Sequence, residues 1–170
     1  MKKIICILLL VSVLGGMYYF SSQEGDVSSQ QSHKVVEIID KVRDKVTLKD
    51  EKLIEIKDKI YSKLRYYDKD YIVRKAAHAS IYACIGASML LVIYLFIKKV
   101  ILSANIAFVL TVMYAIYDEK RQLSVSGRTG SITDVLIDSC GALLAIIVLS
   151  IILTTEKGIV TILNKHKPNT

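Results

Sequence analysis

Ionisable and hydroxyl side chains at helical spacing stand near the ends of three apolar segments. Arg74, His78 and Tyr82 recur every fourth residue and so share one face of a helix. A histidine near carboxylates can transfer protons or hold a divalent cation, and an arginine beside a helix N-terminus favours phosphate or carboxylate. The rest of this set follows in two later segments: Asp118, Glu119 and Gln122, and then Arg128, Ser131, Asp134 and Asp138. Proton transfer and anion binding are the chemistries that these residue types suit.

Asp138 is the residue of this set that helix capping explains least. A rise of about 1.5 Å per residue puts it roughly 10 Å beyond Ser131 along a helix, inside an apolar run. A charge at a bilayer centre costs about 2.5–3.5 kcal/mol, so Asp138 should be paired, hydrogen-bonded or protonated. The candidate partners are Arg74, His78 and Arg128.

The other residues also have structural explanations. Ser131 and Asp134 have the spacing of an ordinary capping box at a helix start. Asp118 and Glu119 fit the solvated end of a helix equally well. A lone histidine in a helix is often a hydrogen-bonded structural residue, and glycines beside an arginine permit a tight turn without any ligand. Both interpretations stay open for each of these residues.

The elements that must position these residues are membrane helices. The 170 residues are 52% apolar with a mean hydropathy of +0.42, which is too apolar for a soluble domain of this size. Crossing a hydrocarbon core about 30 Å thick takes about 20 residues. Apolar runs over 4–20, 76–97, 100–117 and 132–153 therefore predict an all-α bundle of four transmembrane helices in one domain, 1–170. The first run has no A-x-A-like site after it and is expected to stay uncleaved.

The hydrophilic segment 21–75 is predicted to be helical as well. It holds 13 Lys/Arg and 11 Asp/Glu, and two apolar stripes run through it at helical spacing, over 35–46 and 53–64. Residues 47–50 have the pattern of a capping box between them. We expect amphipathic helices that lie on the membrane surface or cover the bundle, with a lipid- or partner-binding surface as the alternative.

Basic residues in the short segments predict the orientation, because they are retained in the cytoplasm. With both termini inside, seven lysines lie on the cytoplasmic side and three basic residues lie in the short outer loop 118–131. The seven are Lys2, Lys3, Lys98, Lys99, Lys157, Lys165 and Lys167. The net charge of +7 thus consists largely of orientation signals, and no nucleic-acid partner is expected.

Small residues predict where the helices approach closely. Ala79, Ala83 and Ala87 recur at every fourth position, and Gly141 with Ala145 forms a similar pair. The cysteines, at positions 6, 84 and 140, lie in apolar runs and are expected to be small buried residues. Neither their spacing nor the His-x-x-x-Tyr spacing is that of a metal site, so no metal and no cofactor are predicted.

Ordered motifs along the chain resemble those of the VanZ family. They are Phe-Ser-Ser-Gln at 20–23, Arg-Lys-Ala-Ala-His at 74–78 with Tyr82, the run 114–122, and Gly-Arg-Thr-Gly-Ser-Ile-Thr-Asp at 127–134 followed by Asp138 and Gly141. Ala145 stands where the family often has a second glycine. The resemblance implies a small four-helix bacterial membrane protein from a family associated with resistance to the lipoglycopeptide teicoplanin. It supplies no mechanism.

Two functions are consistent with these features. The first is action on a lipoglycopeptide or a lipid-linked cell-wall precursor at the outer leaflet of the cell membrane, with membrane lipids or the precursor as partner. Its binding residues would be Arg74, Tyr82, Gln122, Arg128, Ser131 and Asp134. The alternative is an intramembrane enzyme that modifies such a head group, with catalytic candidates His78, Asp118, Glu119 and Asp138. A transporter is disfavoured, because the polar groups lie in one leaflet and no inverted repeat is apparent.

Overall fold

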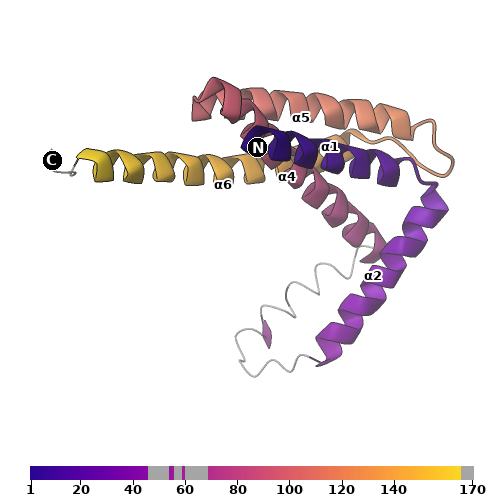
Figure 1. The fold of residues 1–170 in the computed structure, drawn as a ribbon. Helices are drawn as coiled ribbons and strands as arrows, with labels where there is room; N and C mark the ends of the chain where they lie inside the picture. Colours follow the sequence, from indigo (N-terminus) through magenta and orange to yellow (C-terminus); the bar gives the residue numbers. More distant parts are fainter. Residues whose placement is uncertain (46–53, 56–58, 60–68, 166–170) are drawn as a thin grey trace.

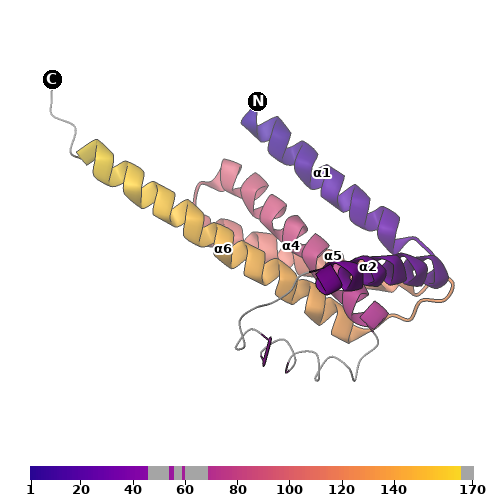
Figure 2. The same cartoon turned by 90° about the horizontal axis from the view of Figure 1, so that it is seen from below.

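The computed structural model describes residues 1–45, 54, 55, 59 and 69–165 of the chain. Within them the chain forms helices and turns without strands. In order, the helices are α1 (Lys2–Ser21), α2 (Gly25–Lys45), α4 (Lys69–Ile97), α5 (Val100–Gln122) and α6 (Ile132–Lys165). Figures 1 and 2 show α1, α4, α5 and α6 bundled lengthwise, with α2 leaving the bundle at an angle. The predicted all-α class is confirmed.

Four of these helices, α1, α4, α5 and α6, are long and apolar enough to cross a membrane. The central helix is α4, which packs against α1, α2, α5 and α6. The protein is therefore a multi-pass membrane protein, as the apolar runs predicted. The bundle leaves one amphipathic helix, α2, outside the spans.

The interior of the bundle is built from small and polar residues, and large apolar side chains cover its outside. On α5 the buried face repeats at every fourth position, with Ser103, Ala107, Thr111 and Ala115 each at most 2% exposed. Ile101, by contrast, is 80% exposed on the same helix. Small residues let helix backbones approach closely, and the large side chains face the lipid.

The closest helix approach is between α4 and α6. A Cβ added at Gly141 would collide with the carbonyl oxygen of Ala79, and one added at Gly86 would lie 3.1 Å from the Cβ of Ala142. The predicted contact through Ala79 and Gly141 is thus confirmed. The other small residues, Ala83, Ala87 and Ala145, line an open groove along the same pair of helices.

Three helices are longer than the apolar runs that predicted them. The spans 76–97, 100–117 and 132–153 correspond to helices over 69–97, 100–122 and 132–165. Hydropathy detects only the part of a helix that lies in hydrocarbon, whereas Glu, Lys, Arg and Gln continue a helix readily in water. The extension of α5 matters most, because it carries Asp118, Glu119 and Gln122 in helical geometry.

The first predicted amphipathic helix is present as α2. Its apolar residues Val35, Ile39 and Val42 are exposed, and His33 Nδ1 lies 3.2 Å from Asp70 Oδ2 on α4. The start of α2 is held against the loop before α6, because the Gly25 N–H donates to the Ser126 carbonyl over 3.1 Å. The second predicted stripe and the capping pattern at 47–50 fall almost wholly outside the described residues.

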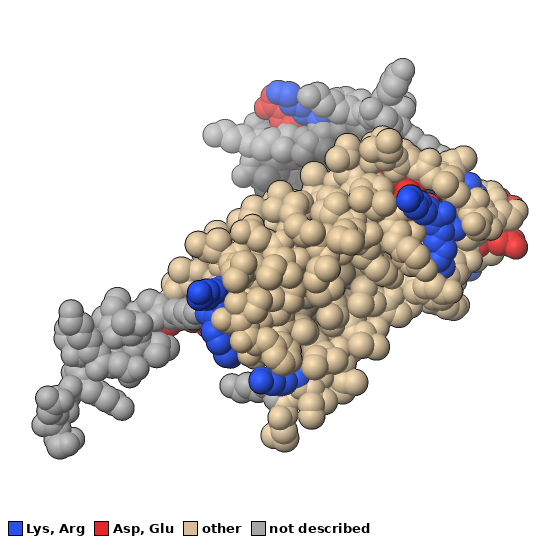
Figure 3. Space-filling model, turned by 90° about the horizontal axis from the view of Figure 1, so that it is seen from above, with Lys and Arg blue, Asp and Glu red and all other residues tan. Residues whose placement is uncertain are grey.

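The end of the bundle away from the loop before α6 carries basic residues. Lys98 and Lys99 form the tight turn between α4 and α5, and Lys3 Nζ lies 4.8 Å from the centre of the Phe96 ring. Figure 3 shows charged side chains at both ends of one face, with a broad uncharged belt between them. Cys84 and Cys140 are exposed on the apolar surface, so the expectation that they are buried is wrong, since the lipid-facing surface is itself apolar.

Candidate functional site

One end of the bundle, which we call the site end, gathers most of the polar residues that the sequence singled out. There α1 ends, α4 begins, α5 ends and α6 begins. Because α1 and α5 both end here, residues 97 positions apart in the chain, Ser21 and Asp118, come into contact. The site end contains two structures, a junction between α1 and α5 and a pocket beside it.

Asp118 is the centre of the α1–α5 junction. Its side chain is 2% exposed, and its Oδ2 accepts hydrogen bonds from Ser21 Oγ over 2.8 Å and from Gln122 Nε2 over 3.0 Å. Its Oδ1 accepts from Arg121 Nη2 over 3.0 Å. With both oxygens occupied, Asp118 ties the end of α1 to the last turn of α5.

Arg121 completes the junction by capping the end of α1. It donates to Ser22 Oγ and, over 3.2 Å, to the Tyr18 carbonyl. Its guanidinium carbon also lies 4.1 Å from the centre of the Tyr18 ring. The Tyr18 carbonyl also accepts hydrogen bonds from the Ser22 N–H over 3.0 Å and from Ser22 Oγ over 2.6 Å, so Arg121 adds a charge-assisted contact to a helix end that Ser22 already caps.

Arg128, in the loop after Gly127, forms the wall between junction and pocket. It donates to the carbonyls of Gln23 and Phe20 over 2.9 and 3.1 Å and to Gln122 Oε1 over 3.0 Å. All three acceptors are neutral, so among the described residues no carboxylate in direct contact offsets the positive charge. Burial, and then the positive charge of Arg74, lower the pKa of Arg128, but a guanidinium stays charged at neutral pH.

The start of α6 is capped by residues from two elements. Glu119 Oε1 accepts from the Ser131 N–H over 2.6 Å, and Ser131 Oγ accepts from the Thr133 N–H over 3.2 Å. The carboxylate of Asp134 forms an ion pair with Lys75. The predicted capping box is thus half formed, because Glu119 takes the N–H that Asp134 would have bound.

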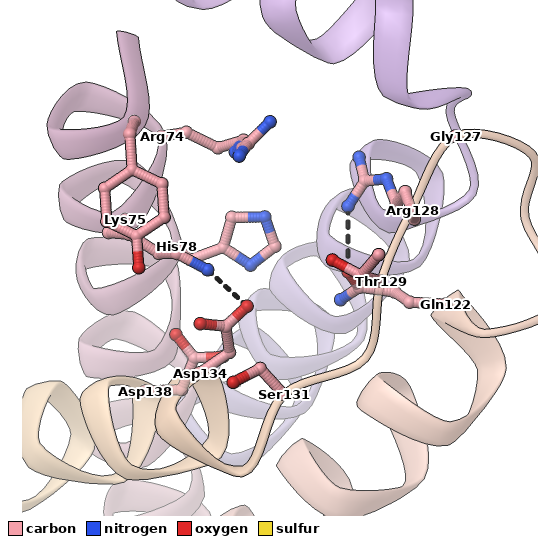
Figure 4. Close-up of a pocket in the computed structure, with 11 residues that line it drawn as sticks. Arg74, Lys75, His78, Gln122, Gly127, Arg128, Thr129, Ser131, Asp134 and Asp138 are labelled. Carbon is pink, nitrogen blue, oxygen red and sulfur yellow. Dashed lines mark hydrogen bonds and ion pairs between the residues drawn. The ribbon is translucent and has the colours of Figure 1, made fainter. Parts of the chain in front are cut away.

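The pocket has a volume of about 280 Å³ and lies between α4, α6 and the loop that joins α5 to α6 (Figure 4). Seven of the ten predicted site residues line it: Arg74, His78, Gln122, Arg128, Ser131, Asp134 and Asp138. Tyr71, Lys75, Gly127 and Thr129 complete the lining, and these were missing from the prediction. Asp118 and Glu119 lie outside the lining, in the junction and the α6 cap.

Tyr82 also lies outside the pocket. It is fully buried in an apolar cluster with Met17, Ile85 and Ala115, and its ring centre is 6.2 Å from that of Tyr114. Its hydroxyl is buried without a hydrogen-bond partner in the described part of the chain. Tyr82 lies one turn after His78 on the same face of α4, but it is not among the residues that line the pocket.

Two ionisable groups of the pocket have no partner. Asp138 is 3% exposed, yet within residues 1–45 and 69–165 its carboxylate makes neither a hydrogen bond nor an ion pair, and the His78 imidazole likewise makes none. Buried polar groups are nearly always paired in folded proteins. Asp134 and Asp138 lie together at one side of the pocket, which we call its floor, with His78 beside them (Figure 4). The side chains of His78 and Asp138 are therefore available to hydrogen-bond a ligand.

Charges are separated across the pocket. Figure 4 shows Arg74 and Arg128 on one side, Asp134 and Asp138 on the other, and His78 between them. The Arg74 guanidinium carbon lies 6.0 Å from the Tyr71 ring. Among the described residues, no group of three or more His, Cys, Asp or Glu is placed to hold a metal ion. The arrangement suits an anion on the arginine side and a proton donor on the other.

Comparisons with known proteins agree with the motifs. The model of the VanZ/LLP1 family matches residues 6–153, which is most of the chain and includes all three polar segments of the site end. No curated protein and no solved structure matches significantly. The protein belongs to the VanZ/LLP1 family.

Proposed function

We propose that the site-end pocket binds the anionic head group of a lipid-anchored molecule at the outer leaflet of the cell membrane. The ligand is a lipoglycopeptide or a lipid-linked cell-wall precursor, and by binding it the protein contributes to teicoplanin resistance. This proposal joins the association of the VanZ family with teicoplanin to the chemistry of the pocket residues.

The observation that carries the proposal is the pair of guanidiniums in the pocket. Arg74 and Arg128 line the same cavity, and the pKa of Arg128 is lowered by burial and then by the positive charge of Arg74. Phosphate and carboxylate are the groups that guanidiniums bind best. An anion between the two would relieve their repulsion and gain hydrogen bonds.

A lipid anchor is favoured by the groove between α4 and α6. The groove has a volume of about 530 Å³ and begins at Ala79 and Gly141, about one turn beyond the pocket residues Lys75 and Asp138. Its lining is almost wholly apolar: Ala79, Ser80, Ala83, Ala87, Gly141, Leu144, Ala145, Val148, Leu149 and Ile152. An acyl or prenyl chain lying there would have its head group beside the pocket.

The test is inhibition of a susceptible host by teicoplanin and by vancomycin. Expression of the protein should raise the inhibitory concentration of teicoplanin more than that of vancomycin. Arg74→Gln should abolish the effect at unchanged membrane abundance, because Arg74 takes no part in the junction. Lys120→Gln, an exposed residue of α5 outside the pocket, is the matched control. An unchanged teicoplanin response with the wild-type protein would contradict the proposal.

A second candidate function is enzymatic modification of the bound head group, with His78 or Asp138 as the general acid or base. The observation that favours it is that His78 and Asp138 both line the pocket and make no hydrogen bond or ion pair with the residues that the structure describes, as an acid or base must be free to act on a ligand. Purified protein incubated with a bacterial lipid extract should then yield a new species by mass spectrometry. His78→Gln should prevent it, and an unchanged lipid profile with wild-type protein would exclude this function for the lipids tested.

A further inference from the structure

We infer that the pocket selects a zwitterionic head group: a phosphodiester that carries a primary ammonium, with the phosphate between Arg74 and Arg128 and the ammonium on Asp138. The inference rests on the anion site of the proposed function and extends it to a further ligand class, beyond lipoglycopeptides and cell-wall precursors. It is carried by Asp138, a buried carboxylate of the pocket for which the described residues provide no hydrogen bond and no ion pair.

Asp138 requires a partner that the described chain does not provide. Its 3% exposure denies it most of the hydration that a carboxylate needs, and burying an unpaired carboxylate is costly. Lys75 on α4 lines the same pocket but is paired with Asp134. Arg128 is held by acceptors at the ends of α1 and α5. Asp138 is therefore either protonated in the free protein or paired with a cation that comes with the ligand, and a ligand ammonium would favour its charged form.

The separation of charge in the pocket points to the same class. A simple anion that reached the pocket floor would meet the carboxylates of Asp134 and Asp138, whereas the guanidiniums stand opposite them (Figure 4). Like-charge contacts of this kind discriminate between ligands. A zwitterion whose ammonium turns toward α6 satisfies both sides of the pocket at once.

The ammonium must carry hydrogens. A carboxylate accepts hydrogen bonds at both oxygens, and in a buried site those bonds replace the water that Asp138 has lost. A primary ammonium can donate three such bonds, whereas a quaternary one donates none. His78, which also lacks a partner, can accept one of the three when its imidazole is neutral.

The experiment is a titration of the full-length detergent-purified protein by calorimetry with three soluble phosphodiesters. Glycerophosphoethanolamine carries a primary ammonium, glycerophosphocholine a quaternary one, and glycerophosphoglycerol none. The ethanolamine compound should bind at least about tenfold more tightly than the other two, the scale expected for one added charge-assisted contact. Asp138→Asn should remove this preference, because it takes away both the partner of the ammonium and part of the repulsion of glycerophosphoglycerol, and Asp138→Glu should retain much of it.

The outcomes separate this inference from the function on which it rests. Equal binding of the three compounds by the wild-type protein, or a preference that survives Asp138→Asn, would overturn the ammonium contact and leave the anion site standing. If none of the three binds, the proposed head-group site itself fails. The wild-type comparison decides the matter even where the Asp138→Asn variant does not fold.

Two sources could supply this chemistry, an aminophospholipid or a water-soluble ester, and a second titration distinguishes them. The protein is placed in nanodiscs of phosphatidylglycerol, with or without phosphatidylethanolamine. A lipid ligand would compete, so the added phosphatidylethanolamine should weaken binding of glycerophosphoethanolamine several-fold. Unchanged binding would assign the site to a soluble zwitterion.

Discussion

Two buried aspartates of the site end differ in whether the protein supplies hydrogen-bond partners for their carboxylates. Asp118 accepts hydrogen bonds from Ser21, Arg121 and Gln122, whereas Asp138 is equally buried and has no partner in the described chain. The first environment stabilises the fold, and the second destabilises it unless a ligand is present. The stability effects of the two residues should therefore have opposite signs.

Replacing Asp118 should destabilise the protein severely. Asp118→Asn replaces one carboxylate oxygen by an amide N–H₂, which cannot accept the hydrogen bonds donated to that oxygen. It also removes the negative charge that pairs with Arg121. We therefore expect the free energy of unfolding to fall by about 2–4 kcal/mol. Ser21→Ala removes one hydrogen bond to the same carboxylate and should cost about 1 kcal/mol. Unfolding of the purified protein by titration with dodecyl sulfate measures both, and equal effects of the two variants would contradict the central position of Asp118.

Replacing Asp138 should instead stabilise the ligand-free protein. Asp138→Asn removes a buried charge that no group pairs, and we expect the free energy of unfolding to rise by about 1–3 kcal/mol. Asp26→Asn, on the exposed side of α2, is the control and should change it by less than about 0.5 kcal/mol. The same titration measures both variants. A loss of stability for Asp138→Asn would show that Asp138 has a structural role instead.

At the scale of the helices, the approach of α4 to α6 determines the width of the pocket. Lys75 and His78 belong to α4, Asp134 and Asp138 belong to α6, and the two helices meet at Ala79 and Gly141 just beyond them. Any side chain at position 141 must move the helices apart or displace a backbone carbonyl. Gly141 therefore determines how far apart the pocket residues of α4 and α6 lie, although Gly141 itself does not line the pocket.

Gly141→Ala should destabilise the bundle because its Cβ has no room. We expect a loss of about 1–3 kcal/mol, as for other overpacked interiors, together with weaker head-group binding. Gly15→Ala is a matched control, since nothing lies within 4 Å of a Cβ added at Gly15 in α1. That change should stabilise the helix by about 0.4–1 kcal/mol. Thermal melting in detergent measures both, and similar melting temperatures for the two variants would contradict the close contact.

The sequence predicted helices better than it predicted contacts. Four spans and the first amphipathic helix follow from periodicity and hydropathy, and the i, i+4 spacing correctly placed Arg74 and His78 on one face. Periodicity carries no information on which partner a side chain meets, so Asp118 and Glu119 were grouped with Asp138 although they bind Ser21, Arg121 and Ser131. The serines at 21 and 22, which directly follow an apolar run, were the available signal for the junction.

At the scale of the whole molecule, the two ends of the bundle differ in charge: the site end carries both acidic and basic side chains, whereas the side chains named at the other end are basic. The site end holds the junction and the pocket, and the opposite end holds Lys3, Lys98 and Lys99. Basic residues near short loops are retained in the cytoplasm during insertion. We therefore propose that the site end faces outward, and the proposed ligands at the outer leaflet require this orientation.

Cysteine labelling tests the orientation directly. In a chain with its three cysteines changed to alanine, Thr129→Cys places a thiol in the pocket loop and Lys99→Cys places one in the opposite turn. A maleimide that does not cross membranes should label the cysteine at position 129 in intact cells and the one at position 99 only after permeabilisation. Denatured samples, in which both thiols react, control for burial within the fold. The reverse pattern would place the pocket at the inner leaflet, where an extracellular lipoglycopeptide does not reach it, and would refute the proposed function whatever the pocket binds.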